Sequence, residues 1–383
     1  MGKKIISVFT ATRAEYHLLY SLIKKINEDE ELILDLIVSG THLSKKFGNT
    51  VDYIISDGFP IGERIETLNE NRSIDDIIAF TLSECSKHFR KVKPDYLVVL
   101  GDRYEIMGAV IAAANALIPI AHIHGGETTI GVIDEAVRHA VTKFSYLHFT
   151  SCEPYRKRVI QLGEHPDRVF NTGSLGVENI LNQPLMSKEE LAHNLRFNLD
   201  NYAVVTFHPL TLDKNGPENQ VSNLIDALMK FDGLNYIVTK ANADAGGDKI
   251  NEILEMTSTK TKRIKLVSSL GLVRYLSALK YCKMVIGNSS SGVLEAPSFY
   301  VPTVNIGDRQ TGRIKSKSII DCLPEKNSII NAMSKALDPE FRNSLRDMPQ
   351  IYGNGNASMI MIAEIKKSLN GKINLMKKFY DLD

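Results

Sequence analysis

The sequence predicts an α/β protein of two Rossmann-like, doubly wound domains that face each other across a cleft. Short apolar runs alternate with amphipathic helical patterns, an order typical of parallel sheets with right-handed crossovers. This alternation lapses near residues 171–182 and then begins afresh, which indicates two such arrays. The 383 residues also exceed the usual size of a single core.

Composition narrows the classes of function. Lys and Arg number 46 against 45 Asp and Glu, and the resulting net charge of +1 argues against a nucleic-acid or membrane-surface protein. The four cysteines stand far apart without a Cys-x-x-Cys pair, so neither a disulfide framework nor a zinc ribbon is indicated. No apolar run reaches membrane-spanning length and no cleavage-like signal precedes the first strand, so we expect a soluble, cytoplasmic protein.

The first array begins with a buried strand at residues 5–9. The loop after it, residues 10–15, leads into a helix near Tyr16, a βα turn of the type that binds phosphate at a helix N-terminus. This loop lacks the glycine pattern of a dinucleotide fingerprint, and the chain contains no P-loop. A second strand is expected at residues 33–38. Ser73 and Asp76 then form a capping-box pattern at the start of a long helix that runs to Lys93.

Carboxylates follow the next two predicted strands, at residues 95–100 and 118–123. Asp102 comes directly after the first of them, and Glu127 comes shortly after the second. Asp134 opens the helix that precedes a further strand at residues 146–150. Open α/β sheets bind their ligands outside the carboxyl ends of the strands. Any one of these carboxylates could instead be a helix N-terminal charge favoured by the helix dipole, but the three together favour a functional site.

The second array contains a segment suited to a diphosphate. GNSSSGVLE leaves a buried strand and enters a helix, where glycine, hydroxyl groups and free N–H groups favour an anion. Ser289 and Ser290 would face phosphate oxygens, and Glu295 could accept hydrogen bonds from a ribose diol. The alternative is a serine-rich helix cap with Glu295 on a solvated face. The strands expected in this array are residues 203–207, 236–239, 264–267, 284–286 and 303–306.

A set of segments gives the chain a family resemblance. They are TATRAEYHLL, SGTHLSKKFGNT, GDRYE, HGGE, GVIDEAVRHA, TFHPLT, NADAG, GNSSSGVLEA, NIGDRQTGR and YGNGNAS. In this order they resemble the UDP-N-acetylglucosamine 2-epimerases, above all the hydrolysing branch that makes free N-acetylmannosamine for sialic acid synthesis. The resemblance implies a glycosyltransferase-B-like fold. Residues 1–172 would carry the catalytic carboxylates, residues 173–356 would bind UDP, and a final helix within residues 357–383 would cross back to the first domain.

The resemblance also implies roles for individual residues. Asp102, Glu127 and Asp134 match the catalytic carboxylates, and Arg103 matches a residue near the sugar and the diphosphate. The implied ligands are a UDP-sugar and UDP, with no metal or other cofactor, and a homodimer is expected. Ala11 departs from the family pattern, which often has glycine there, and its β-carbon could narrow the phosphate-facing turn. The residues that match UDP-binding positions are Arg13, His208, Ser289, Ser290, Glu295 and Arg309.

The implied reaction needs proton transfer on both faces of the sugar. The hydrogen on carbon 2 is not next to a carbonyl, so its removal requires the diphosphate to begin leaving carbon 1. Elimination gives UDP and a 2-acetamidoglycal, to which water then adds at carbon 1 while carbon 2 is reprotonated from the opposite face. We expect Asp102 to take the first proton and Glu127 with Asp134 to assist hydration. Clustering of the three carboxylates should keep one of them protonated.

Several alternatives stay open from the sequence. The nearest is the same reaction on a nucleotide-linked 2,4-diacetamido-2,4,6-trideoxy sugar, for legionaminic acid synthesis. A glycosyltransferase of the same fold and a non-catalytic nucleotide-sugar sensor are further possibilities, although neither needs the carboxylate set. His122 and His124 could form a metal pair, but no further ligand pair accompanies them, so buried and satisfied histidines are the favoured interpretation.

Overall fold

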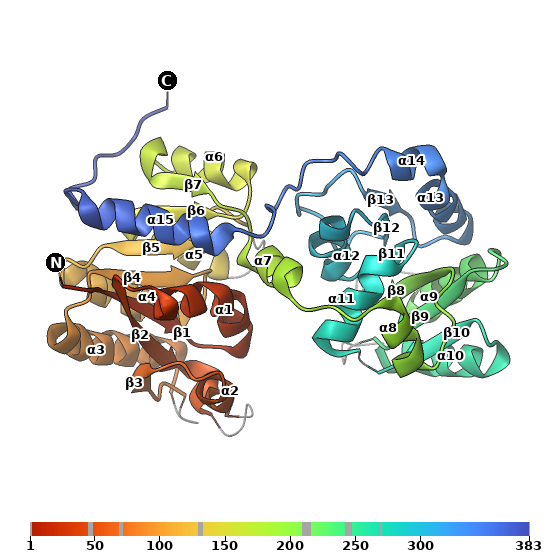
Figure 1. Cartoon of the computed structure of the whole chain (residues 1–383), viewed down its shortest axis with the longest axis horizontal. Helices are drawn as coiled ribbons and strands as arrows, with labels where there is room; N and C mark the ends of the chain where they lie inside the picture. Colours follow the sequence, from red (N-terminus) through yellow and green to blue (C-terminus); the bar gives the residue numbers. More distant parts are fainter. Residues whose placement is uncertain are drawn as a thin grey trace. The chain divides into compact units, whose positions relative to one another are not determined.

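The computed structural model describes residues 2–44, 49–68, 72–128, 133–208, 216–241, 247–268 and 270–382. The chain divides into two compact units, one made of Met1–Asn179 with Ile351–Asp383 and the other of Ile180–Gln350 (Figure 1). Two features expected to lie at strand ends, Pro209 and segment 242–246, fall outside the described residues. Within the described ranges, no helix is both long enough and apolar enough to cross a membrane.

The described residues of the first unit form a seven-stranded, parallel sheet. Its strand order reverses between β1 and β4, the arrangement of a doubly wound fold, and this confirms the predicted fold class. In sheet order the strands are β3 (Ile61–Ile65), β2 (Leu32–Ser39), β1 (Lys4–Thr10), β4 (Tyr96–Leu100), β5 (Ile120–Ile123), β6 (Leu147–Thr150) and β7 (Val169–Asn171).

Helices cover both faces of this sheet. On one face, Leu19 of α1 and Met361 of α15 join the buried residues of β1. On the other face, Phe89 of α3, Val110 of α4 and Val141 of α5 pack together with β4. Burial of each such side chain stabilises the fold by about 1.5–3 kcal/mol. The helices are α1 (Arg13–Glu28), α2 (Val51–Ser56), α3 (Ile74–Val92), α4 (Tyr104–Asn115), α5 (Asp134–Phe144), α6 (Glu153–Gln161), α7 (Leu175–Asn182) and α15 (Ala357–Asn370).

The C-terminal helix α15 belongs to the first unit, as predicted. Glu178 of α7 is fully buried and accepts hydrogen bonds from the backbone N–H of Ser358 (2.6 Å) and from its hydroxyl (2.5 Å). Nearby, the two chain segments that lead out of and back into this unit touch at two glycines. A β-carbon at Gly173 would lie 2.8 Å from the Cα of Gly353, so both positions need the absence of a side chain.

The described residues of the second unit form a six-stranded, parallel sheet with the same kind of reversal, here between β8 and β11. In sheet order its strands are β10 (Ile264–Val267), β9 (Asn235–Thr239), β8 (Tyr202–Thr206), β11 (Val285–Gly287), β12 (Thr303–Ile306) and β13 (Ile319–Cys322). Its helices are α8 (Lys188–Leu195), α9 (Gly216–Leu228), α10 (Gly247–Lys260), α11 (Gly271–Tyr281), α12 (Ser290–Leu294), α13 (Lys326–Leu337) and α14 (Pro339–Asn343).

Local signals in the sequence set several helix starts. The Ser73 hydroxyl accepts a hydrogen bond from the backbone N–H of Asp76, and the Asp76 carboxylate accepts one from the backbone N–H of Ser73. The predicted capping box at the start of α3 is therefore confirmed. Ser187 and Glu190 form the same reciprocal pair at the start of α8. At its other end α3 stops at Lys93, whose left-handed backbone (φ 52°) is set before a proline that cannot continue the helix.

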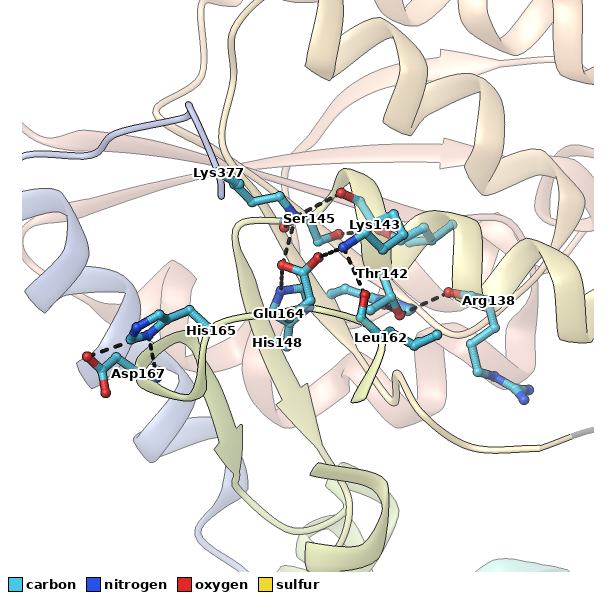
Figure 2. Close-up of polar contacts among 12 residues, drawn as sticks. Arg138, Thr142, Lys143, Ser145, His148, Leu162, Glu164, His165, Asp167 and Lys377 are labelled. Atoms are coloured by element: carbon cyan, nitrogen blue, oxygen red, sulfur yellow. Dashed lines mark hydrogen bonds and ion pairs between the residues drawn. The ribbon is translucent and has the colours of Figure 1, made fainter. Parts of the chain in front are cut away.

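A buried carboxylate ties the extended C-terminal segment to the first unit (Figure 2). Glu164 is 1 % exposed and lies within hydrogen-bond distance of His148 (3.1 Å), Lys143 (2.6 Å) and Lys377 (2.8 Å). Burial alone would raise the pKa of Glu164, but the bonds from these three groups outweigh it and lower the pKa to about 2. Its stabilising contribution is therefore present above its ordinary pKa and is lost only as the pH falls toward about 2.

The same lysine closes the end of α5. The ammonium group of Lys377 donates to the carbonyl oxygens of Lys143 (2.8 Å), in the last turn of that helix, and of Ser145 (2.6 Å), its C-cap residue. Next to it, the backbone N–H of Tyr380 donates to the carbonyl oxygen of Gly163. The C-terminal segment thus supplies a cation where the α5 dipole favours one.

Lys377→Met should lower the free energy of unfolding by about 1–3 kcal/mol, because Glu164 keeps a buried charge with fewer donors and the two carbonyl oxygens lose theirs. Urea unfolding followed by circular dichroism measures this change. Lys378→Met, at an exposed neighbouring position, is the control and should stay within about 0.5 kcal/mol. Equal stability of the two variants would show that Lys377 contributes nothing.

Candidate active site

In the first unit, the candidate residues follow β1, β4 and β5, next to the reversal in strand order. Thr12 caps α1, and the carboxylate of Glu15 accepts hydrogen bonds from the backbone N–H groups of Ala11 (2.8 Å) and Thr12 (2.9 Å). This capping box fixes the loop and leaves Arg13 exposed as the first residue of α1. The methyl group of Ala11 is fully buried beside Gly40, so it does not line the exposed part of the turn.

The side chain of Arg103 is held by the carboxylate of Glu105. Arg103 precedes α4, and its guanidinium donates to both carboxylate oxygens of Glu105, at 2.6 and 3.1 Å. Glu105 is fully buried and Glu15 is 6 % exposed. Burial raises the pKa of Glu15 to about 7, against the opposing effects of the Ala11 N–H and the Arg103 charge. The Arg103 guanidinium is therefore held by Glu105 and lies within electrostatic reach of Glu15.

Two of the predicted carboxylates, Asp134 and Glu127, lie within electrostatic reach of the third, Asp102. Burial raises the pKa of Asp102, the Arg138 guanidinium opposes that rise, and the negative charges of Asp134 and Glu127 add to it. Arg138 of α5 forms an ion pair with Asp102 and a second one with Glu135 (3.3 Å). The predicted clustering at the carboxyl ends of β4 and β5 thus brings together groups from the β4 loop, the β5 loop and α5.

Glu127 is oriented by Ser151, the residue directly after β6. The hydroxyl of Ser151, which is 1 % exposed, donates to one of its oxygens at 2.7 Å, and the same oxygen lies 3.8 Å from Nδ1 of His124. The glycines between His124 and Glu127 pack closely, since a β-carbon at Gly126 would collide with the carbonyl oxygen of Tyr155. The HGGE loop is therefore held in one conformation by its neighbours.

The two histidines of β5 have different surroundings. His122 is fully buried, with its Nε2 2.8 Å from the carbonyl oxygen of Gly101 and its Nδ1 3.2 Å from the hydroxyl of Thr142. Burial lowers the pKa of His122 to about 3, so this ring is neutral and structural. His124 lies one residue beyond the strand. In the part of the chain that the structure describes, no group of three or more His, Cys, Asp or Glu side chains could hold a metal ion.

In the second unit, Asn288 organises the candidate diphosphate loop. It is fully buried, and its side-chain amide exchanges two hydrogen bonds of 2.8 Å with the backbone of His208. The backbone carbonyl oxygen of Asn288 accepts hydrogen bonds from the side chains of Gln310 (2.8 Å) and Arg309 (3.3 Å). The loops after β8, β11 and β12 are thereby joined. The sequence pattern did not single out Asn288 or Gln310, because only the fold brings these loops together.

The serines and the acid of this loop occupy different environments. Ser289 caps α12 through its side chain, Ser290 is the first residue of that helix, and both are half-buried. Glu295 follows α12 and accepts a hydrogen bond from the hydroxyl of Ser291 at 2.5 Å. Burial raises the pKa of Glu295, and the Ser291 hydrogen bond opposes this only in part. Glu295 is therefore partly buried rather than fully solvated, while Ser289 does cap the helix as the alternative for this segment supposed.

Comparisons with known proteins agree on one family. The family model described as "UDP-N-acetylglucosamine 2-epimerase" matches residues 24–366. "Polysialic acid biosynthesis protein P7" of Escherichia coli is 40% identical over 385 residues, which are 99% of this chain and 98% of that protein. "GDP/UDP-N,N'-diacetylbacillosamine 2-epimerase (hydrolyzing)" of Campylobacter jejuni is also 40% identical, over 387 residues and 100% of both chains.

A solved structure supports the fold. The crystal structure of UDP-GlcNAc 2-epimerase from Neisseria meningitidis bound to UDP-GlcNAc matches with a TM-score of 0.79. The match covers 95% of this chain and 100% of that chain, at 18% sequence identity. At this identity the likeness concerns the arrangement of strands and helices.

Glu295→Gln should raise the melting temperature of the ligand-free protein at pH values above the ordinary pKa of glutamate. The raised pKa means that the folded state keeps a proton which the unfolded state has already lost, so stability falls as the pH rises through this range. The amide variant should lack that fall. Melting curves between about pH 5 and pH 8 test this, with the exposed Glu252→Gln as control. A parallel fall in both variants would contradict it.

Proposed function

The chain belongs to the UDP-N-acetylglucosamine 2-epimerase family, and we propose that it converts UDP-N-acetylglucosamine and water to N-acetylmannosamine and UDP. At the coarser level it is a hydrolysing nucleotide-sugar 2-epimerase, in keeping with its relatives. The observation that supports this best is the cluster of Asp102, Glu127 and Asp134 at the carboxyl ends of neighbouring strands, with the pKa of Asp102 raised. Carboxyl groups gathered in this way can serve both as bases and as acids.

The nucleotide would bind chiefly to the second unit. We assign Ser289, Ser290 and Arg309 to the diphosphate and Glu295 to the ribose diol, while His208 supports the same loop. Burial raises the pKa of Glu295, and hydrogen bonds from the hydroxyl groups of a ribose would stabilise its ionised form. We also assign Arg13 and Arg103 of the first unit to the diphosphate.

The residues then divide the reaction between them. As the arginines and the loop N–H groups stabilise the departing diphosphate, Asp102 takes the hydrogen from carbon 2 as a proton, which gives UDP and the acetamidoglycal. Arg138 holds Asp102 through the ion pair and stabilises its ionised form. Glu127 and Asp134 would assist addition of water at carbon 1 and return of a proton to carbon 2.

We propose that the protein works as a homodimer, which light scattering can test.

A second substrate has equal support from the relatives. The Escherichia coli and Campylobacter jejuni proteins share the same identity with this chain, and the second is named for N,N'-diacetylbacillosamine. The same elimination and hydration would then act on a nucleotide-linked 2,4-diacetamido-2,4,6-trideoxy sugar. Incubation with both nucleotide sugars and identification of the products by NMR decides between them.

The isotope pattern of the product tests the reaction itself. In deuterium oxide, deuterium should appear at carbon 2 of the free epimerised sugar. In oxygen-18 water, the label should appear at carbon 1 while UDP stays unlabelled, because the carbon–oxygen bond breaks. Retention of the original hydrogen at carbon 2 would show simple hydrolysis, and a UDP-linked epimer without free sugar would show the non-hydrolysing reaction.

Asp102→Asn should keep UDP affinity and lose turnover by about 10²–10⁴-fold, because the amide keeps the shape and a hydrogen bond to Arg138 but cannot accept the proton. Calorimetry measures UDP binding, and release of free sugar measures turnover. Asp75→Asn, in the exposed first turn of α3, is the matched control and should behave as wild type. Near-normal turnover of Asp102→Asn would assign the first proton to another group.

A further inference from the structure

A cavity of about 390 Å³ lies in the second unit, beside the end of α13 and helix α14 (Figure 1). Tyr300 comes shortly before β12, and Lys283, whose carbonyl oxygen contacts the Arg342 guanidinium, comes shortly before β11. Ser289 and Arg309, in contrast, follow the carboxyl ends of these two strands. The cavity therefore lies at the amino ends of the strands and is separate from the candidate UDP loops. Its lining residues are Tyr300, Leu337, Pro339, Arg342, Asn343 and Arg346.

Local contacts fix the backbone around this cavity. The carboxylate of Asp338 caps α14 by accepting a hydrogen bond from the backbone N–H of Phe341 at 2.8 Å. After α14, Leu345 is fully buried and anchors the turn that leads to Arg346. On the other side, Tyr300 ends a short helical turn with a left-handed backbone (φ +57°) and is 43 % exposed. The cavity thus has an aromatic side chain available at its surface.

Among the described residues, two guanidinium groups and no acidic side chain line the cavity. Arg342 donates to the carbonyl oxygen of Lys283, which orients its planar group. Its other N–H groups have no acceptor in the described part of the chain, and they are not buried. The side chain of Arg346 is exposed. Both guanidinium groups therefore have donors that a ligand in the cavity can reach.

The charges of these two guanidinium groups are not neutralised locally. Within the described ranges, neither Arg342 nor Arg346 forms an ion pair with a carboxylate. Burial lowers the pKa of Arg342, and only the Cys282 thiol opposes this. That thiol is uncharged near neutral pH, because burial raises its pKa to about 12. Charges that are partly removed from water are ordinarily paired in folded proteins, so this pair of cations favours an anionic ligand.

We propose that this cavity binds the phosphate monoester of a small molecule that contains a ring. A phosphate monoester carries close to two negative charges at neutral pH, and its oxygens match the donor geometry of two guanidinium groups. Tyr300, Leu337 and Pro339 supply an apolar wall against which a sugar or a base can pack. The cavity volume falls within the range of small-molecule sites, about 300–1,000 Å³. This site does not depend on the proposed reaction.

Melting curves of the full-length protein test the proposal with inorganic phosphate, glucose 6-phosphate and adenosine 5′-monophosphate. A ligand of the folded state raises the melting temperature as its concentration rises, and sodium chloride keeps the ionic strength constant. At least one of the two ring-containing probes should act on wild type at lower concentration than inorganic phosphate. Arg346→Gln should raise the apparent dissociation constant of that probe by about 10-fold, because a charged donor is lost.

Three more variants locate the response. Arg342→Lys keeps the charge but loses the donor fork, so it should also weaken binding. Lys230→Gln removes a charge from an exposed position of the same unit and should behave as wild type. Arg309→Gln changes the candidate UDP loop and should retain the response that Arg346→Gln lacks. If Arg346→Gln responds as wild type does, or if neither ring-containing probe stabilises wild type, the inference is overturned while the proposed function stands.

Discussion

The position of the candidate site depends on one feature of each sheet: its strands are parallel, and their order reverses near the middle of the sheet. The paired strands are parallel within each sheet, so the carboxyl ends of the strands of one sheet lie along the same side of that sheet. Because the order reverses between β1 and β4, and again between β8 and β11, the loops at those points lead to opposite faces and leave room for a ligand. The TATRAE, GDRYE and GNSSSG segments follow three of these four strands.

The sequence predicted every central strand and one edge strand, β10, but missed the other three edge strands. The expected strands at residues 264–267 and 303–306 coincide with β10 and β12, and the others agree within a few residues. Three strands at sheet edges, β3, β7 and β13, were not predicted. Each is short and partly exposed, so it lacks the continuous apolar run that marks a strand buried on both faces. In β3 every second residue is exposed, as is typical of a strand with one solvated face.

At the site, the sequence identified chemistry but not partners. Asp102, Glu127 and Asp134 could be selected because they stand at strand ends. Arg138 and Ser151, which orient two of them, come from α5 and from the segment after β6, and their contacts exist only in the folded sheet. The spacing of Asp134 and Arg138, four residues apart on one helix, was the one local hint. Asn288 in the second unit gave no such hint, because its role is to join three loops.

The position of α15 in the first unit sets an order of events during synthesis. Met361 and Ile365 complete the core on one face of the N-terminal sheet, and Ser358 satisfies the buried charge of Glu178. Until the ribosome has passed these residues, the part of that face which α15 covers stays open, whereas the segment Ile180–Gln350 is already complete. The second unit can therefore complete its core first, and the N-terminal unit, although made earlier, completes its core only with the last helix.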